Sequence, residues 1–217
     1  MTRLFKMPDR RQTDSIKWGY YPEDVIPMWV ADMDFTSPPE VIRALQERVQ
    51  HGVFGYGGSS KTLSELIVER MERLYGWKIA TEDILLLPGV ITGFNLTCQA
   101  ITNPGDSLII QPPIYPPFFS VAENAGLKEL QCPLGNDGND NYEIDFNQLE
   151  KALNKSRVLM FCNPHNPIGK VYSRIELERI AEICLRNDVV ICSDEIHSDL
   201  VYKGQQHIPI ASINPEI

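Results

Sequence analysis

Short apolar runs alternate with helix-period segments from about residue 83 to the end of the chain. The runs have the length of buried strands, and the amphipathic stretches between them are typical of βαβ units and a mainly parallel sheet. We therefore expect an α/β fold of three αβα layers. Strands are predicted at 84–87, 107–111, 128–132, 158–162 and 189–193, and helices at 91–101, 117–125, 146–153 and 174–186. Asp145 and Ser173 stand where capping boxes would begin the last two helices.

The first 60 residues are richer in Pro, Gly and aromatic residues and indicate an extended arm. One helix is predicted there, with Ser37 as its cap, Pro38 at its first position and Gly52 at its end. Its apolar positions recur at helical spacing and would form one stripe. A second amphipathic helix is predicted from about residue 63 to a stop at Gly76.

Composition and charge narrow the class of partner. The chain has 20 Lys and Arg against 29 Asp and Glu, a formal charge of −9, which gives no electrostatic support to a nucleic-acid surface. No apolar run has the length of a signal-peptide core or a membrane span, so we expect a cytoplasmic protein with a small-molecule partner. Its five cysteines form no C-x-x-C pair, which favours reduced thiols over disulfides or a zinc site.

Two of the predicted strands are followed by loops suited to a phosphorylated aromatic ligand. The turn P-G-V-I-T-G at 88–93 opens into a helix, so the backbone amides of Val90, Ile91 and Thr92 would be free for an anion; such turns are also common without one. Four prolines stiffen the loop P-P-I-Y-P-P-F and would present Tyr115 for stacking on a flat ring. Packing of Tyr115 beneath its own loop is the alternative.

The next two strand ends carry amides and a carboxylate. The loop N-P-H-N-P-I-G-K at 163–170 would fix the side chains of Asn163 and Asn166 toward a cleft, although turn formation explains part of this string. Asp194 follows the last apolar strand, where its charge needs a cation or a donor, or where it caps a helix. Together with the phosphate turn and Tyr115, these groups are the set that a phosphorylated pyridine cofactor requires.

Six motifs give the chain a family resemblance from about Trp18 onward. They are W-V-A-D-M-D-F at 29–35, F-G-Y at 54–56, P-G-V-I at 88–91, P-P-I-Y-P-P-F at 112–118, N-P-H-N-P-I-G-K-V at 163–171 and S-D-E-I-H-S-D-L at 193–200. The chain resembles the pyridoxal-phosphate (PLP) enzymes of the class I and II aminotransferase superfamily, of fold type I. Within it, the chain looks similar to the MalY/PatB-like cystathionine β-lyases.

The resemblance implies a cofactor site. Backbone groups of Val90 and Ile91 would hold the phosphate, Tyr115 would stack on the pyridine ring and Asn166 would bond the ring hydroxyl. Asp194 would pair with the pyridine nitrogen and keep it protonated.

Further roles implied by the resemblance concern substrate and partner subunit. Ala31 and Asp32 match the segment that approaches the substrate carboxylate, and Tyr56 matches a tyrosine that reaches the cofactor phosphate of the neighbouring subunit in a homodimer. His197 stands where aminotransferases more often have a Tyr that contacts the ring hydroxyl of the cofactor. The resemblance therefore implies a cofactor contact for His197 and favours a lyase, although a surface histidine is the alternative. The implied domains are residues 1–52, an N-terminal arm and part of the small domain, and residues 53–217, an incomplete PLP-binding large domain.

The family's Schiff-base lysine, in a Ser-x-x-Lys context, is expected after the point where the sequence stops. Lys170 and Lys203 do not match that context, so no catalytic residue is assigned and the chain looks like an N-terminal portion. The implied reaction is β-elimination from cystathionine or cysteine S-conjugates, giving thiol, pyruvate and ammonia. An aminotransferase and a non-catalytic remnant are the alternative hypotheses.

Overall fold

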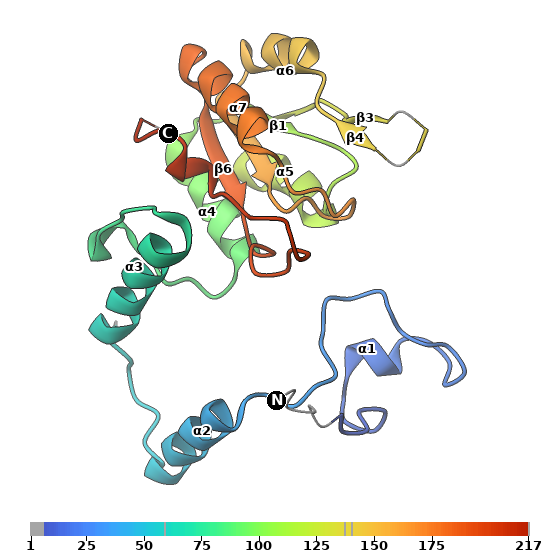
Figure 1. Ribbon diagram of the computed structural model, residues 1–217, viewed down its shortest axis with the longest axis vertical. Helices are drawn as coiled ribbons and strands as arrows, with labels where there is room; N and C mark the ends of the chain where they lie inside the picture. Colours follow the sequence, from blue (N-terminus) through green and yellow to red (C-terminus); the bar gives the residue numbers. More distant parts are fainter. Residues whose placement is uncertain (1–6, 59, 137, 140, 217) are drawn as a thin grey trace. The chain divides into compact units, whose positions relative to one another are not determined.

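The chain divides into two compact units, Met1–Gly58 and Ser59–Ile217, in a computed structural model that describes residues 7–58, 60–136, 138–139 and 141–216 (Figure 1). Each unit is described by itself. The first contains α1 (Ile16–Gly19) and α2 (Pro39–His51). The helices of the second are α3 (Lys61–Tyr75), η1 (Thr81–Asp83), α4 (Val90–Ile101), η2 (Pro116–Ser120), α5 (Val121–Ala125), α6 (Phe146–Leu153), α7 (Arg174–Arg186) and η3 (Ile210–Ser212).

A parallel four-stranded sheet forms the centre of the second unit. Its strands are β1 (Ser107–Ile110), β2 (Lys128–Gln131), β5 (Val158–Cys162) and β6 (Val190–Asp194), in the order β2-β1-β5-β6. Every neighbouring pair is parallel. The four carboxyl ends therefore lie at one edge of the sheet, as the alternating sequence pattern predicted. A short antiparallel pair that the pattern did not predict, β3 (Gly135–Asn136) and β4 (Tyr142–Glu143), follows β2.

Apolar side chains cover both faces of this sheet, which makes the predicted αβα layers. Leu108 and Ile110 pack with α4, η2 and α5, whereas Ile109 packs with α6 and α7 on the other face. In Figure 1, α6 and α7 accordingly lie across the sheet from α4. The described side chains of β5 are all buried, as a central parallel strand requires.

The strand predicted at 84–87 is wrong. Ile84 has extended dihedrals, but no described residue pairs with the segment, so no strand forms there. Leu85 and Leu86 are exposed. An apolar run needs a hydrogen-bonded neighbour to become a strand, and the periodicity of the run cannot supply one.

Helix ends agree with the sequence signals in most cases. Ser173 accepts from the Glu176 amide and Glu176 bonds back to it, which completes the predicted capping box of α7. Asp145 caps α6 through two backbone amides, but the reciprocal Gln148 bond that a capping box requires is not among the described contacts. Gly52 ends α2 in the left-handed conformation, as predicted. The start of α2 was predicted one residue too early, because Pro38 occupies the cap position and Ser37 does not.

Several predicted boundaries differ by one residue, and the helix predicted at 117–125 divides into η2 and α5. No helix among the described residues is long and apolar enough to cross a lipid bilayer.

Candidate functional site

The ends of β5 and β6 are held together by Asn163. Its backbone N–H donates to the Asp194 carbonyl at 3.0 Å. Its side chain is fully buried, donates to the Ile208 carbonyl at 3.3 Å and accepts from the Tyr172 amide at 3.3 Å. The expectation that Asn163 faces a cleft is therefore wrong, because both ends of its amide are used inside the fold.

His165 joins the loop after β5 to the loop after β1. Its Nε2 lies 2.9 Å from the Pro113 carbonyl, and its Nδ1 lies 3.0 Å from the Tyr172 hydroxyl. A carbonyl can only accept, so Nε2 carries the proton and Nδ1 accepts from Tyr172. Burial lowers the pKa of His165 and keeps the ring neutral.

The loop after β5 closes on itself behind His165. The His165 amide donates to the Lys170 carbonyl at 2.8 Å, and the Gly169 amide donates to the His165 carbonyl at 2.7 Å. Gly169 has a φ of 68°, which explains why glycine stands at this position. The result is a rigid loop that carries Asn166 at its outer turn.

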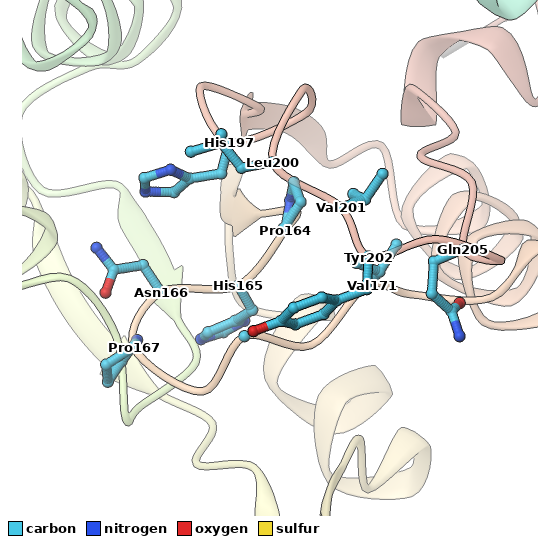
Figure 2. A pocket seen from close by; sticks show the side chains of 11 residues that line it. Pro164, His165, Asn166, Pro167, Val171, His197, Leu200, Val201, Tyr202 and Gln205 are labelled. Atoms are coloured by element: carbon cyan, nitrogen blue, oxygen red, sulfur yellow. The ribbon is translucent and has the colours of Figure 1, made fainter. Parts of the chain in front are cut away.

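A cavity of about 500 Å³ lies beside this loop and brings together two of the predicted site residues, Asn166 and His197 (Figure 2). The two side chains project to the same side in the close-up. Leu200, Tyr202 and Gln205 line the cavity as well, and the sequence reasoning did not single them out.

Asp194 lies at the end of β6, three residues before His197, and its carboxylate is short of partners. The residue is 7% exposed, and the carboxylate accepts from the Ile196 amide at 3.1 Å. Among the described residues, no Lys or Arg contributes to its electrostatics. Burial raises the pKa of Asp194, and the Ile196 amide and the nearby His197 offset only part of that effect. A positively charged hydrogen-bond donor would therefore stabilise this buried carboxylate.

The predicted phosphate turn begins α4. Gly89 precedes the helix with a φ of 122°, and the Gly93 amide donates to the Gly89 carbonyl at 3.1 Å. The amides of Val90 and Ile91 precede that bond and have no carbonyl one turn back within the helix. Both residues are partly exposed.

Tyr115 is half-buried at the start of η2. Its ring packs against the apolar cluster under α4 and α5, so part of it contacts the core as the alternative interpretation predicted. The rest of the side chain is accessible. Because His165 holds the Pro113 carbonyl two residues earlier, the position of this loop is tied to the loop of Asn166.

The remaining predicted residues, Ala31, Asp32 and Tyr56, belong to the first unit. Tyr56 is fully exposed. Asp32 forms an ion pair with Arg10 at 2.6 Å, and hydrogen bonding to Arg10 lowers its pKa. Its charge is therefore balanced within the arm.

The same cluster contains Asp34, which sequence reasoning missed. Lys17 Nζ and Trp18 Nε1 each donate to its carboxylate at 2.7 Å, and Arg10 donates at 3.0 Å. Lys17 also donates to the Asp32 carbonyl at 2.6 Å. Hydrogen bonding, first from Lys17, lowers the pKa of Asp34 to about 2. These partners are 16 to 24 residues apart in sequence, which no local pattern reveals.

Metal ligands do not gather in the part of the chain that the structure describes, where no three His, Cys, Asp or Glu side chains are placed to hold an ion. The cysteines, all described, are free thiols. Burial raises the pKa of the Cys162 thiol, next to the loop of Asn166, to about 12, so it is not a thiolate at neutral pH.

Comparison with known proteins gives close relatives over almost the whole chain. The chain is 42% identical to cystathionine beta-lyase PatB of Bacillus subtilis, over 97% of this chain and 56% of the relative. Among solved structures it is similar to cystalysin from Treponema denticola, which contains pyridoxal 5'-phosphate, and to the PLP-bound C-S lyase from Staphylococcus hominis. For each the TM-score is 0.90 and the identity 34%, over 98% of this chain and 56% of the other.

The chain thus spans a little over half the length of the relatives that it matches. The model of the family "Aminotransferase class I and II" matches residues 23–217, which include the strand ends, the Asn166 loop and Asp194. The chain therefore belongs to the class I and II aminotransferase family.

Proposed function

We propose that this chain is part of a PLP-dependent carbon–sulfur β-lyase that acts on cystathionine or related cysteine S-conjugates. The relatives named above support the reaction class, since one is a cystathionine beta-lyase and another a C-S lyase. The proposed products are a thiol, pyruvate and ammonia. The observation that carries the proposal is the buried Asp194 carboxylate, which has one backbone donor and no cationic partner among the described residues.

The residues at the sheet edge fit the cofactor. A protonated pyridine nitrogen is the charged donor that Asp194 lacks, and a charge-assisted bond to it would stabilise the carboxylate. When bound, PLP supplies an electron sink for the negative charge that develops on the substrate's α-carbon.

The chain's own groups would orient that cofactor. We propose that Asn166 and His197, which share one cavity, bond polar atoms on the same edge of the pyridine ring. The accessible part of Tyr115 would stack on the ring, and the amides of Val90 and Ile91 would donate to the phosphate at the start of α4.

No lysine of the described chain is assigned as the catalytic base. Lys170 Nζ donates to the Tyr142 carbonyl and pairs with Glu176, both at 2.8 Å, which fixes the loop of Asn166. Lys203 is exposed. Lys170 is thus a structural residue. Because the chain spans a little over half the length of its relatives, we propose that the base is supplied by a longer protein, expressed from the complete reading frame.

The reaction is tested on that protein after loading with PLP. With L-cystathionine as substrate, we expect pyruvate and a free thiol to appear in equal amounts, measured with lactate dehydrogenase and a thiol reagent. Asp194→Asn should lose this activity, whereas the exposed control Asp188→Asn should keep it. Conversion of a 2-oxo acid to an amino acid without thiol release would contradict the proposal and indicate an aminotransferase.

We also propose a homodimer in the cytoplasm. The fully exposed ring of Tyr56 supports a partner that covers it, and five free cysteines suit a reducing compartment. Sedimentation of the purified protein tests the dimer, which a purely monomeric profile would contradict.

A further inference from the structure

Glu195 directly follows the strand that ends in Asp194, and its carboxylate gathers three donors. Oε1 accepts from the Ser193 hydroxyl at 2.9 Å and from the Ile210 amide at 3.0 Å. Oε2 lies 2.8 Å from His207 Nε2. The sequence reasoning assigned no role to Glu195 or His207. The contacts join the end of β6 to a segment that lies 12 to 15 residues later.

His207 has one partner for its two ring nitrogens. A carboxylate oxygen can only accept, so Nε2 carries a proton, and Nδ1 is buried with no hydrogen-bond partner. The side chain is 1% exposed, and the rings of Tyr75 and His207 are nearly perpendicular, with their centroids 5.6 Å apart. A cavity of about 470 Å³ adjoins the ring, and Tyr75, Trp77 and Glu195 are among its lining residues. Among the residues that the structure describes, Glu195 is therefore the hydrogen-bond partner of the His207 ring.

The segment from His207 to Ile210 contacts the ends of two strands. Besides the Glu195 contacts, the Ile208 carbonyl accepts from the Asn163 side chain, and Asn163 itself donates to the Asp194 carbonyl. The Glu195 carbonyl also accepts from Ser198 at 2.9 Å, within the turn that carries His197. Asp194 and His197 thus stand on backbone that is held by these hydrogen bonds, and Glu195 takes part in them through both its carboxylate and its carbonyl.

We infer that Glu195 and His207 are positioning residues, which hold the backbone that presents Asp194 and His197 to the pyridine ring. This inference rests on the proposed function. Neither residue lines the cavity that contains Asn166 and His197. Both act through the backbone of Asp194, whose own carboxylate has only the Ile196 amide to orient it.

A double-mutant cycle tests whether Glu195 acts through Asp194. The dissociation constant of PLP is measured by absorbance titration of the apoprotein, expressed from its complete reading frame. In Glu195→Gln the side chain loses its negative charge and one of its two acceptor oxygens, so we expect PLP to bind at least tenfold more weakly. In the Asp194→Asn background the same change should add less than twofold. The exposed control Glu178→Gln should stay within twofold of wild type.

Substitutions of His207 test the inference a second time, in case Glu195→Gln does not fold. His207→Gln can place an N–H near the position of Nε2 and should stay within threefold of wild-type PLP affinity. His207→Ala removes the donor and should weaken PLP binding about tenfold. A merely structural role would lower the urea midpoint without this difference in affinity.

The outcomes separate this inference from the proposed function. Equal effects of Glu195→Gln with and without Asp194, or unchanged PLP affinity in both Glu195→Gln and His207→Ala, would overturn the inference. Wild-type protein that binds PLP but releases no thiol and pyruvate would overturn the proposed reaction. The double-mutant cycle of Glu195 and Asp194 could still be measured, because it depends on PLP binding alone. Wild-type protein without measurable PLP affinity would overturn both.

Discussion

Replacing His165 with alanine should destabilise the protein and loosen the loop of Tyr115. The change removes the donor to the Pro113 carbonyl and the acceptor of the Tyr172 hydroxyl, and Tyr172 is only 1% exposed. A buried polar group left without a partner costs about 1–3 kcal/mol. With the lost packing of a buried ring, we expect a decrease of about 3 kcal/mol in the free energy of unfolding.

The substitution Tyr172→Phe isolates the hydrogen bond between the Tyr172 hydroxyl and His165 Nδ1. In the wild type it leaves His165 Nδ1 without its donor and should cost about 1 kcal/mol. In His165→Ala it removes the stranded hydroxyl and should cost nothing or stabilise the fold. The coupling between the two positions is therefore about 1–2 kcal/mol.

Equilibrium urea unfolding followed by circular dichroism measures all four proteins of this cycle, and the exposed His51→Ala serves as a histidine control that should change stability by less than about 0.5 kcal/mol. If the effects of His165→Ala and Tyr172→Phe add within about 0.5 kcal/mol, the hydrogen bond does not contribute as argued.

Three further predictions concern titratable groups. Burial raises the pKa of Asp194 because it disfavours the charged carboxylate, so Asp194→Asn should stabilise the cofactor-free protein at pH 7, as measured by urea unfolding. The same change should weaken PLP binding by about 2 kcal/mol, roughly thirtyfold. Unchanged PLP affinity would contradict this prediction. Burial lowers the pKa of His165, so as the pH falls this histidine is protonated more readily in the unfolded chain than in the folded protein. The free energy of unfolding should therefore fall as pH drops below about 6.5, with a smaller fall in His165→Ala. Equal pH slopes for the two proteins would refute the assignment. The pKa of Asp34 is lowered to about 2, so its contribution to folding stability should be present above about pH 4 and lost as pH falls toward 2. Trp18 fluorescence, measured with the other tryptophans replaced by Phe, should change in that pH window. A change above about pH 5 would contradict this prediction.

Local signals in the sequence predicted elements whose cause is local. The capping box at Ser173 depends on residues three apart, and Gly52 and Gly76 end helices because they adopt a left-handed backbone without strain. The strands β1 and β5 were recognisable because burial on both faces demands continuous apolar runs.

Features that depend on distant neighbours were not predictable. The segment at 84–87 has a strand-like composition but no described pairing neighbour. The two amide side chains of one loop look alike in sequence, yet Asn163 is used inside the fold and Asn166 lines a cavity. The Glu195–His207 contact joins residues 12 apart across a turn, and no periodicity marks such a pair.

The strand order has a consequence for synthesis on the ribosome. β1 can pair with β2 soon after both have emerged, but its other neighbour, β5, begins about 50 residues later in the chain. At about 5–20 residues per second, the second edge of β1 waits about 3–10 s for its partner. During that interval a strand whose three apolar residues, Leu108, Ile109 and Ile110, are buried in the finished fold remains open to other chains. We therefore expect the nascent polypeptide to depend on chaperones until β5 has emerged.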